Sequence, residues 1–240
     1  MLLQTPHIHQ PADETSGDIR AFLRQWHEGD EVANGANYGP QDAAMDELVF
    51  GRSLVGLEKA LSTGEQAQIR SRHPGELVYV DGETCNWTPY GVLRSIVRHL
   101  HPSAKDVVYD LGAGFGTLPI YAGATTDAVA IGIELVHHRV EVARSAIGRL
   151  GLGNVEMREG SVLDHDFSDG TVFYMFAPFS PATRNAVMAR IGEIAREQRV
   201  KVVMRRMTGG WMEGTWLADA KQTEVPGAGV HTVIIEAGPS

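Results

Sequence analysis

The sequence predicts an α/β fold with a seven-stranded, mostly parallel sheet, an N-terminal helical cap and a C-terminal antiparallel hairpin. From Val107 onward, short apolar runs alternate with stretches of helical periodicity, which is typical of a parallel sheet with crossover helices. The first apolar run leads into glycines at positions 112, 114 and 116, which allow a sharp turn at the carboxyl end of a strand. Near the chain end, the turn-forming run 225–229 joins two predicted strands as in a hairpin.

The chain is expected to divide into a helical N-terminal extension, residues 1–75, and a domain that carries the site, residues 76–240. Apolar residues at helical spacing and capping residues indicate helices in the first part. The elements expected there are helices over 16–29, from 42 onward and within 54–69, followed by a short strand over 77–80. The expected domain strands are 107–111, 128–133, 154–157, 172–176, 200–205, 216–223 and 230–235, and the expected crossover helices are 119–124, 136–150 and 184–197.

A helix is expected to begin at Thr88, with the threonine as N-cap and Pro89 in the first turn. Apolar residues follow at helical spacing as far as Leu100 and give this helix one buried face. It is expected to pack beside the strand that starts at Val107, with its first residues near the glycine loop.

Composition narrows the class of protein. The chain has 240 residues, of which 43% are hydrophobic and 21% charged, as in ordinary globular proteins. The net charge of −9, without a cluster of lysine or arginine, argues against DNA or large RNA as a partner. The chain shows no signal-peptide pattern and no apolar run of about 18 residues, and its single cysteine is Cys85. We therefore expect a cytoplasmic protein that does not span a membrane, and we predict no metal site.

The glycine loop is predicted to bind a nucleotide-type ligand, because glycines let a ligand lie against bare peptide groups. A dinucleotide fingerprint would need a glycine where Thr117 stands, and a phosphate-binding loop would need a lysine after the glycines. Glu134 ends the next predicted strand, where an acid can accept hydrogen bonds from both ribose hydroxyls. The alternative is that Glu134 only caps the following helix.

The run from Asp110 to Gly116 resembles motif I of the class I S-adenosylmethionine (SAM) methyltransferases, which have a Rossmann-like fold. The resemblance implies that Ser161 and Val162 contact adenine, where many relatives carry an aspartate in place of the serine. A serine hydroxyl can accept a hydrogen bond from the adenine amine without the strength of a charged group. Asp164 is an alternative residue for the role of that aspartate at the adenine amine, and Asp166 is a less favoured alternative.

Over about residues 86–185 the chain resembles two kinds of lysine methyltransferase. One modifies the ATP synthase c subunit and adenine nucleotide translocase, and the more distant one is the disruptor-of-telomeric-silencing type that modifies histones. The likeness is carried by the run from Thr88-Pro89-Tyr90 through the motif I loop, with 22 residues from Thr88 to Asp110, and for the closer family also by the Ala177-Pro178 pair. The donor-binding residues that it implies are Thr88, Asp110, Gly112, Ala113, Gly114, Gly116, Glu134, Leu135, Ser161, Val162 and Phe176.

The expected function is methyl transfer from SAM to an amine, with a protein lysine as one acceptor and S-adenosylhomocysteine (SAH) as the product. Tyr90 and Phe179 are the residues proposed for the catalytic channel, with Trp87 beside them, because an aromatic lining desolvates a lysine ammonium and lowers its pKa. Tyr90 and Phe179 are equally plausible as core residues. The alternatives are a small-molecule N- or O-methyltransferase and a noncatalytic regulator that keeps the fold.

Overall fold

The computed structural model describes residues 15–29, 38–57, 62–73, 88–176, 179–205, 215–217, 220–229 and 232–239. Within these residues it contains one seven-stranded sheet with the order β3-β2-β1-β4-β5-β7-β6. Strands β1 to β5 run parallel, and β7 lies antiparallel to both β5 and β6. The strands are β1 (Val107–Leu111), β2 (Val129–Glu134), β3 (Val155–Glu159), β4 (Val172–Met175), β5 (Val200–Arg205), β6 (Gln222–Glu224) and β7 (Thr232–Ala237). The predicted mostly parallel sheet and its closing hairpin are confirmed.

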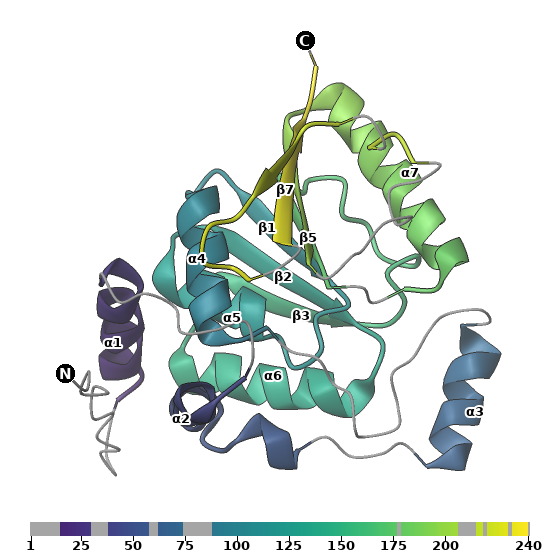
Figure 1. Ribbon diagram of the computed structural model, residues 1–240. Coiled ribbons are helices and arrows are strands. Elements are labelled where there is room, and N and C mark those ends of the chain that lie inside the picture. Colours follow the sequence, from purple (N-terminus) through teal and green to yellow (C-terminus); the bar gives the residue numbers. More distant parts are fainter. Residues whose placement is uncertain are drawn as a thin grey trace.

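Helices cover both faces of the sheet (Figure 1). Helices α4, α5 and α6 pack on one face and α7 packs on the other, and a separate cluster of buried apolar side chains fills each side. The described helices are α1 (Ser16–Glu28), α2 (Pro40–Phe50), η1 (Leu54–Gly56), α3 (Thr63–Arg72), α4 (Tyr90–Leu100), α5 (Thr117–Thr125), α6 (His137–Leu150) and α7 (Pro181–Glu197). Apart from Thr88, which precedes α4, the residues predicted above to bind the donor lie at or just after the carboxyl ends of β1, β2, β3 and β4, and the fold brings these strand ends to one edge.

The N-terminal helices α1 and α2 join the core on the α4–α6 face. Ile19 and Leu23 of α1 and Met45 and Val49 of α2 are fully buried there. The predicted boundary at residues 75–76 lies outside the described residues, as does the predicted strand over 77–80.

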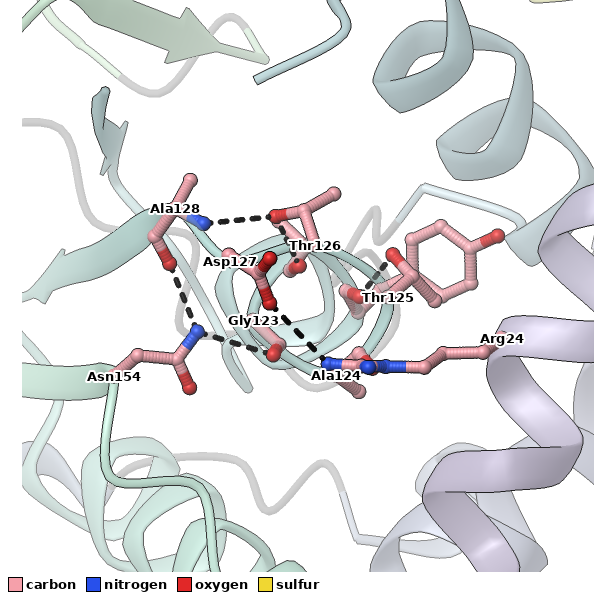
Figure 2. Close-up of polar contacts among 10 residues, drawn as sticks. Arg24, Gly123, Ala124, Thr125, Thr126, Asp127, Ala128 and Asn154 are labelled. Atoms are coloured by element: carbon pink, nitrogen blue, oxygen red, sulfur yellow. Dashed lines mark hydrogen bonds and ion pairs between the residues drawn. The ribbon is translucent and has the colours of Figure 1, made fainter. Parts of the chain in front are cut away.

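Polar contacts fasten the end of α5 to its neighbours (Figure 2). Arg24 of α1 donates through Nε to the Ala124 carbonyl at 3.1 Å, and its Nη2 lies 3.5 Å from the Asp127 carboxylate. The Asn154 amide donates to the carbonyls of Gly123 at 3.1 Å and Ala128 at 2.8 Å. One side chain thus ties the end of α5 to the start of β2.

Replacing Asn154 by alanine is expected to lower the free energy of unfolding by about 1–3 kcal/mol, because two part-buried carbonyls lose their donor. Urea denaturation of the purified chain measures this change. Asn185→Ala on α7, where the Asn185 side chain accepts only from the exposed Arg184, is the control and should change stability by less than about 0.5 kcal/mol. Equal effects for the two variants would contradict the assigned role of Asn154.

Two helix predictions are wrong in detail. Helix α4 begins at Tyr90 with Pro89 as N-cap, so Thr88 does not cap it. The reason is that a residue before proline favours extended backbone, and the Thr88 hydroxyl pairs with Tyr174 instead. The helical pattern expected between Leu54 and Ile69 is broken into η1 and α3, and α3 buries none of its side chains.

Candidate functional site

The glycine loop joins β1 to α5 and is built on left-handed backbone. Gly112, Gly114 and Gly116 have φ of 88°, 57° and 72°. The amides of Gly112 and Ala113 both donate to the Ile133 carbonyl, at 2.9 and 3.0 Å, and the Gly116 amide donates to Ala113 at 2.8 Å. These amides therefore already have acceptors within the protein and are not available to a phosphate group.

Gly116 has a second reason to be glycine, because a Cβ there would lie 2.9 Å from the Met157 sulfur and 3.2 Å from Ala143 Cβ. We expect Gly116→Ala to destabilise the fold by about 1–3 kcal/mol through the strained φ and this overpacking. Gly148 on α6 is the matched control, since a Cβ there meets nothing within 4 Å. Gly148→Ala should stabilise the chain by about 0.5–1 kcal/mol. Thermal denaturation should show a lower melting temperature than wild type for Gly116→Ala and a higher one for Gly148→Ala.

Glu134 is held at the end of β2 by contacts to both carboxylate oxygens. Oε2 accepts from the Gly114 amide at 2.8 Å, and Oε1 accepts from the Val136 amide at 3.0 Å. Arg139, one turn into α6, places Nη1 3.4 Å from Oε1, and both side chains are 7% exposed. Glu134 thus holds the N-cap residue of α6, but among the described residues no side chain caps the helix itself, and the ribose role of Glu134 stays a prediction. Arg139 was not found from the sequence, because an arginine inside a helix gives no signal of burial.

Asp110 lies on β1 in register with Gly132 of β2 and Tyr174 of β4. It is 4% exposed, and its carboxylate makes no hydrogen bond to any residue that the structure describes. Burial, together with the negative charge of Glu134, raises the pKa of Asp110 well above its ordinary value. Among the described residues no ion pair with a cationic side chain involves Asp110, and a buried acid pair of this kind favours a cationic ligand.

The predicted adenine contacts follow β3. Ser161 and Val162 are buried, and the Ser161 hydroxyl accepts from the Leu163 amide at 3.1 Å. The Val162 amide donates to no described group, which leaves it available to a ring nitrogen. Asp164 faces solvent and lies 3.8 Å from His73 at the end of α3. The alternative that Asp164 replaces the family aspartate has no support in these contacts.

Thr88 lies at the start of α4, where its hydroxyl is 2.5 Å from the Tyr174 hydroxyl. Both side chains are buried. Because Tyr174 pairs in register with Asp110, this contact brings Thr88 next to the end of β1. Tyr174 of β4, which contacts the predicted donor-binding residue Thr88, was not among the residues that the sequence indicated.

The two residues proposed for the catalytic channel are buried. The Tyr90 ring packs edge-on against Tyr121 of α5, and its hydroxyl lies beside Asp46 of α2. Burial raises the pKa of Asp46 to about 6. Phe179 is 7% exposed and belongs to the cluster on the α7 face. Their channel roles stay predictions, and Trp87 lies outside the described residues.

Phe176 and Leu135, the remaining predicted contacts, are half-buried at the ends of β4 and β2. The buried guanidinium of Arg205 lies 5.0 Å from the centre of the Phe176 ring. Leu135 faces a cavity of about 650 Å³ between α3 and the β2–α6 turn, which Ile69 and His73 also line. Helix α3 thereby forms one wall next to the predicted adenosine side.

The described residues contain neither a metal-binding cluster nor a membrane-spanning helix. No three His, Cys, Asp or Glu side chains in this part of the chain come together in a way that would hold a metal ion. None of its helices is both long and apolar enough to cross a membrane.

Comparison with known proteins places the fold. No protein-family model matches the chain. A protein-lysine N-methyltransferase of Saccharolobus islandicus (strain REY15A) is 33% identical over 91 residues, which are 37% of this chain and 56% of that protein. This chain therefore spans little more than half the length of that curated relative.

Two solved structures are similar to this chain. An RNA methyltransferase from Salinibacter ruber in complex with SAH has a TM-score of 0.50 and 23% identity, over 65% of this chain and 95% of that one. A SAM-dependent methyltransferase from Thiobacillus denitrificans in complex with SAH has a TM-score of 0.43 and 21% identity, over 61% of this chain and 56% of that one. The first of these structures establishes that the chain has the Rossmann-like methyltransferase fold.

Proposed function

We propose that the chain is a SAM-dependent methyltransferase whose acceptor is an amine, the side chain of a protein lysine. The observation that carries the proposal is the charge of the site. Asp110 and Glu134 are two buried acids at one strand edge, and the amides of the three loop glycines and of Ala113 donate to the protein itself. Pyrophosphate needs free amides and is repelled by carboxylates, whereas SAM carries an ammonium and a sulfonium and no phosphate.

The residues present fit SAM in order along this edge. Glu134 retains lone pairs for the ribose hydroxyls, the Val162 amide suits an adenine ring nitrogen, and Asp110 suits the ammonium group. Thr88 and Tyr174 stand beside Asp110, at the end where the methyl group would lie. SAM supplies a methyl group that its positive sulfur already activates.

The protein's part in the reaction is to exclude water and to hold the acceptor in line. A neutral amine forms the new N–C bond as the S–C bond breaks, the electron pair of that bond goes to sulfur, and the methylated amine gives up one proton. Positioning within about 3 Å supplies most of the acceleration. The Thr88 and Tyr174 hydroxyls are oxygen acceptors suited to orient an amine.

Lysine as the acceptor is supported by sequence likeness and by charge. The relative from Saccharolobus islandicus is a protein-lysine N-methyltransferase, and its match with this chain reaches 33% identity. The net charge of −9 attracts lysine-bearing segments and disfavours RNA, the substrate class named for the Salinibacter ruber protein.

The test measures binding first and transfer second. Titration calorimetry with SAH should show binding, and absence of binding to both SAH and SAM would overturn the whole proposal. Labelled SAM is then incubated with the full chain and, separately, with protein, RNA and metabolite fractions of a cell extract. Label in protein, found by mass spectrometry on lysine, supports the proposal. Label only in RNA or metabolites would reject lysine as the acceptor, and the Glu134→Gln variant serves as the control for background transfer.

A further inference from the structure

The connection between β3 and β4 contains no helix. Residues 160–171 run through turns, so most of their carbonyl groups have no helical partner. The loop amides of Gly160 and Asp164 bond to Glu134 and Ser161, at 2.9 and 3.0 Å. These bonds fix the start of the loop and leave its carbonyls to be satisfied from elsewhere.

Arg190 of α7 supplies donors to three of those carbonyls. Its Nη1 donates to Val162 at 3.3 Å and to Leu163 at 3.2 Å, and its Nη2 donates to His165 at 2.6 Å. The guanidinium carbon lies 4.1 Å from the centre of the buried Phe167 ring. A planar guanidinium is suited to several acceptors at once and to stacking on an aromatic ring, whereas an ammonium group is not.

The carbonyl of Val162 belongs to the residue whose amide is available to adenine. That carbonyl shares its peptide unit with the Leu163 amide, which donates to the Ser161 hydroxyl at 3.1 Å. Turning this unit would release the Ser161 hydroxyl and change the backbone of Val162, whose own amide is in the preceding unit. Arg190 reaches the loop from α7, while Val162 follows the carboxyl end of β3, at the strand edge where the donor is expected.

From these contacts we propose that Arg190 is a positioning residue that fixes the 161–167 loop so that its backbone recognises the adenine base of the donor. The inference rests on the proposed function, since it assigns the base-recognition step of the same site. Arg190 touches neither donor nor acceptor and acts through the loop.

The experiment compares Arg190→Ala with Arg196→Ala in the full chain. Arg196 lies on the same helix and is exposed, and within the described residues its side chain makes no hydrogen bond or ion pair with the loop. For Arg190→Ala we expect SAH affinity to fall roughly tenfold or more, with kcat at saturating SAM kept within about twofold. Its preference for SAH over S-inosylhomocysteine should also fall, because the loop no longer holds its base-reading groups. Arg196→Ala should keep the wild-type SAH affinity and the wild-type preference for SAH over S-inosylhomocysteine.

Chemical rescue separates positioning from general destabilisation. The Arg190 side chain lines an open cavity of about 360 Å³ together with Phe167 and Glu193. Millimolar guanidinium should enter the space left in Arg190→Ala and restore SAH affinity, without effect on Arg196→Ala. If Arg190→Ala does not fold, Arg190→Lys is used in its place, and its base preference should fall in the same way.

The outcomes are distinct. Wild-type chain that binds no SAH overturns the proposed function and this inference with it. A different outcome overturns this inference alone: the wild-type chain binds SAH, and the folded Arg190 variant keeps the same SAH affinity and the same base preference.

Discussion

Glu134→Ala is expected to lower the free energy of unfolding by about 3–5 kcal/mol, the largest loss for any single change at the site. The substitution removes the carboxylate opposite Arg139 while that guanidinium stays 7% exposed. It also removes the acceptor of the Gly114 and Val136 amides, which hold the glycine loop and the start of α6. Urea denaturation monitored by circular dichroism measures the loss.

The control for this prediction is Glu141→Ala on α6. Glu141 pairs with Arg144 at 3.1 Å, but both side chains are about half exposed. An exposed pair at this spacing is worth only about 0.3–0.5 kcal/mol. A loss of similar size in the two variants would show that the buried pair does not stabilise the fold. For donor binding, Glu134→Gln is the better variant, since it keeps one oxygen acceptor, and we expect SAH affinity to fall at least tenfold.

Asp110→Asn is expected to raise the melting temperature of the ligand-free chain and to weaken SAM binding. Burial, and next the charge of Glu134, raise the pKa of Asp110 above its value in the unfolded chain, so folding takes up a proton between those two values. Stability from this group is therefore present at low pH and is lost as the pH rises through the folded pKa. Asparagine cannot ionise, so the variant avoids that loss of stability. Each kcal/mol of stability gained raises the melting temperature by roughly 2–4 °C.

Asp106, which immediately precedes β1, is the matched control, because its pKa is shifted in the opposite direction to that of Asp110. Burial acts upward on its pKa, but hydrogen bonds from Ser103 and Thr171 outweigh it and lower the pKa overall. Stability from Asp106 is present above its unfolded pKa and is lost as the pH falls. Asp106→Asn should therefore lower the melting temperature at pH 7 and leave SAM affinity unchanged. A melting temperature for Asp110→Asn that is lower than wild type at pH 7 would contradict the charge assignment of the site.

The sheet could be predicted from the sequence because each strand carries its own apolar run and the crossovers have helical periodicity. The β1 loop and Glu134 could be predicted for the same reason, since both lie where a strand ends. In each case a local pattern decides where the residue lies, and the fold then brings strand ends to a common edge.

The other site features depend on contacts between residues far apart in sequence. The hydrogen bond of Thr88 with Tyr174 and the ion pair of Arg139 with Glu134 form only after the sheet is assembled. Arg190 looks like any helix-surface arginine until its bonds to the loop are seen. The Asp46 carboxylate accepts the Leu54 amide where η1 begins, a contact between two elements that no local sequence pattern indicates.

The burial of α1 and α2 against α4, α5 and α6 has a consequence for how the protein is made. Synthesis proceeds from the N-terminus at about 5–20 residues per second, so Ile19, Leu23, Met45 and Val49 leave the ribosome seconds before the helices that cover them. During that interval their apolar surface is open to chaperones and to other nascent chains. The yield of active protein in a cell should therefore depend on the rate of translation through α5 and α6 as well as on the stability of the finished fold.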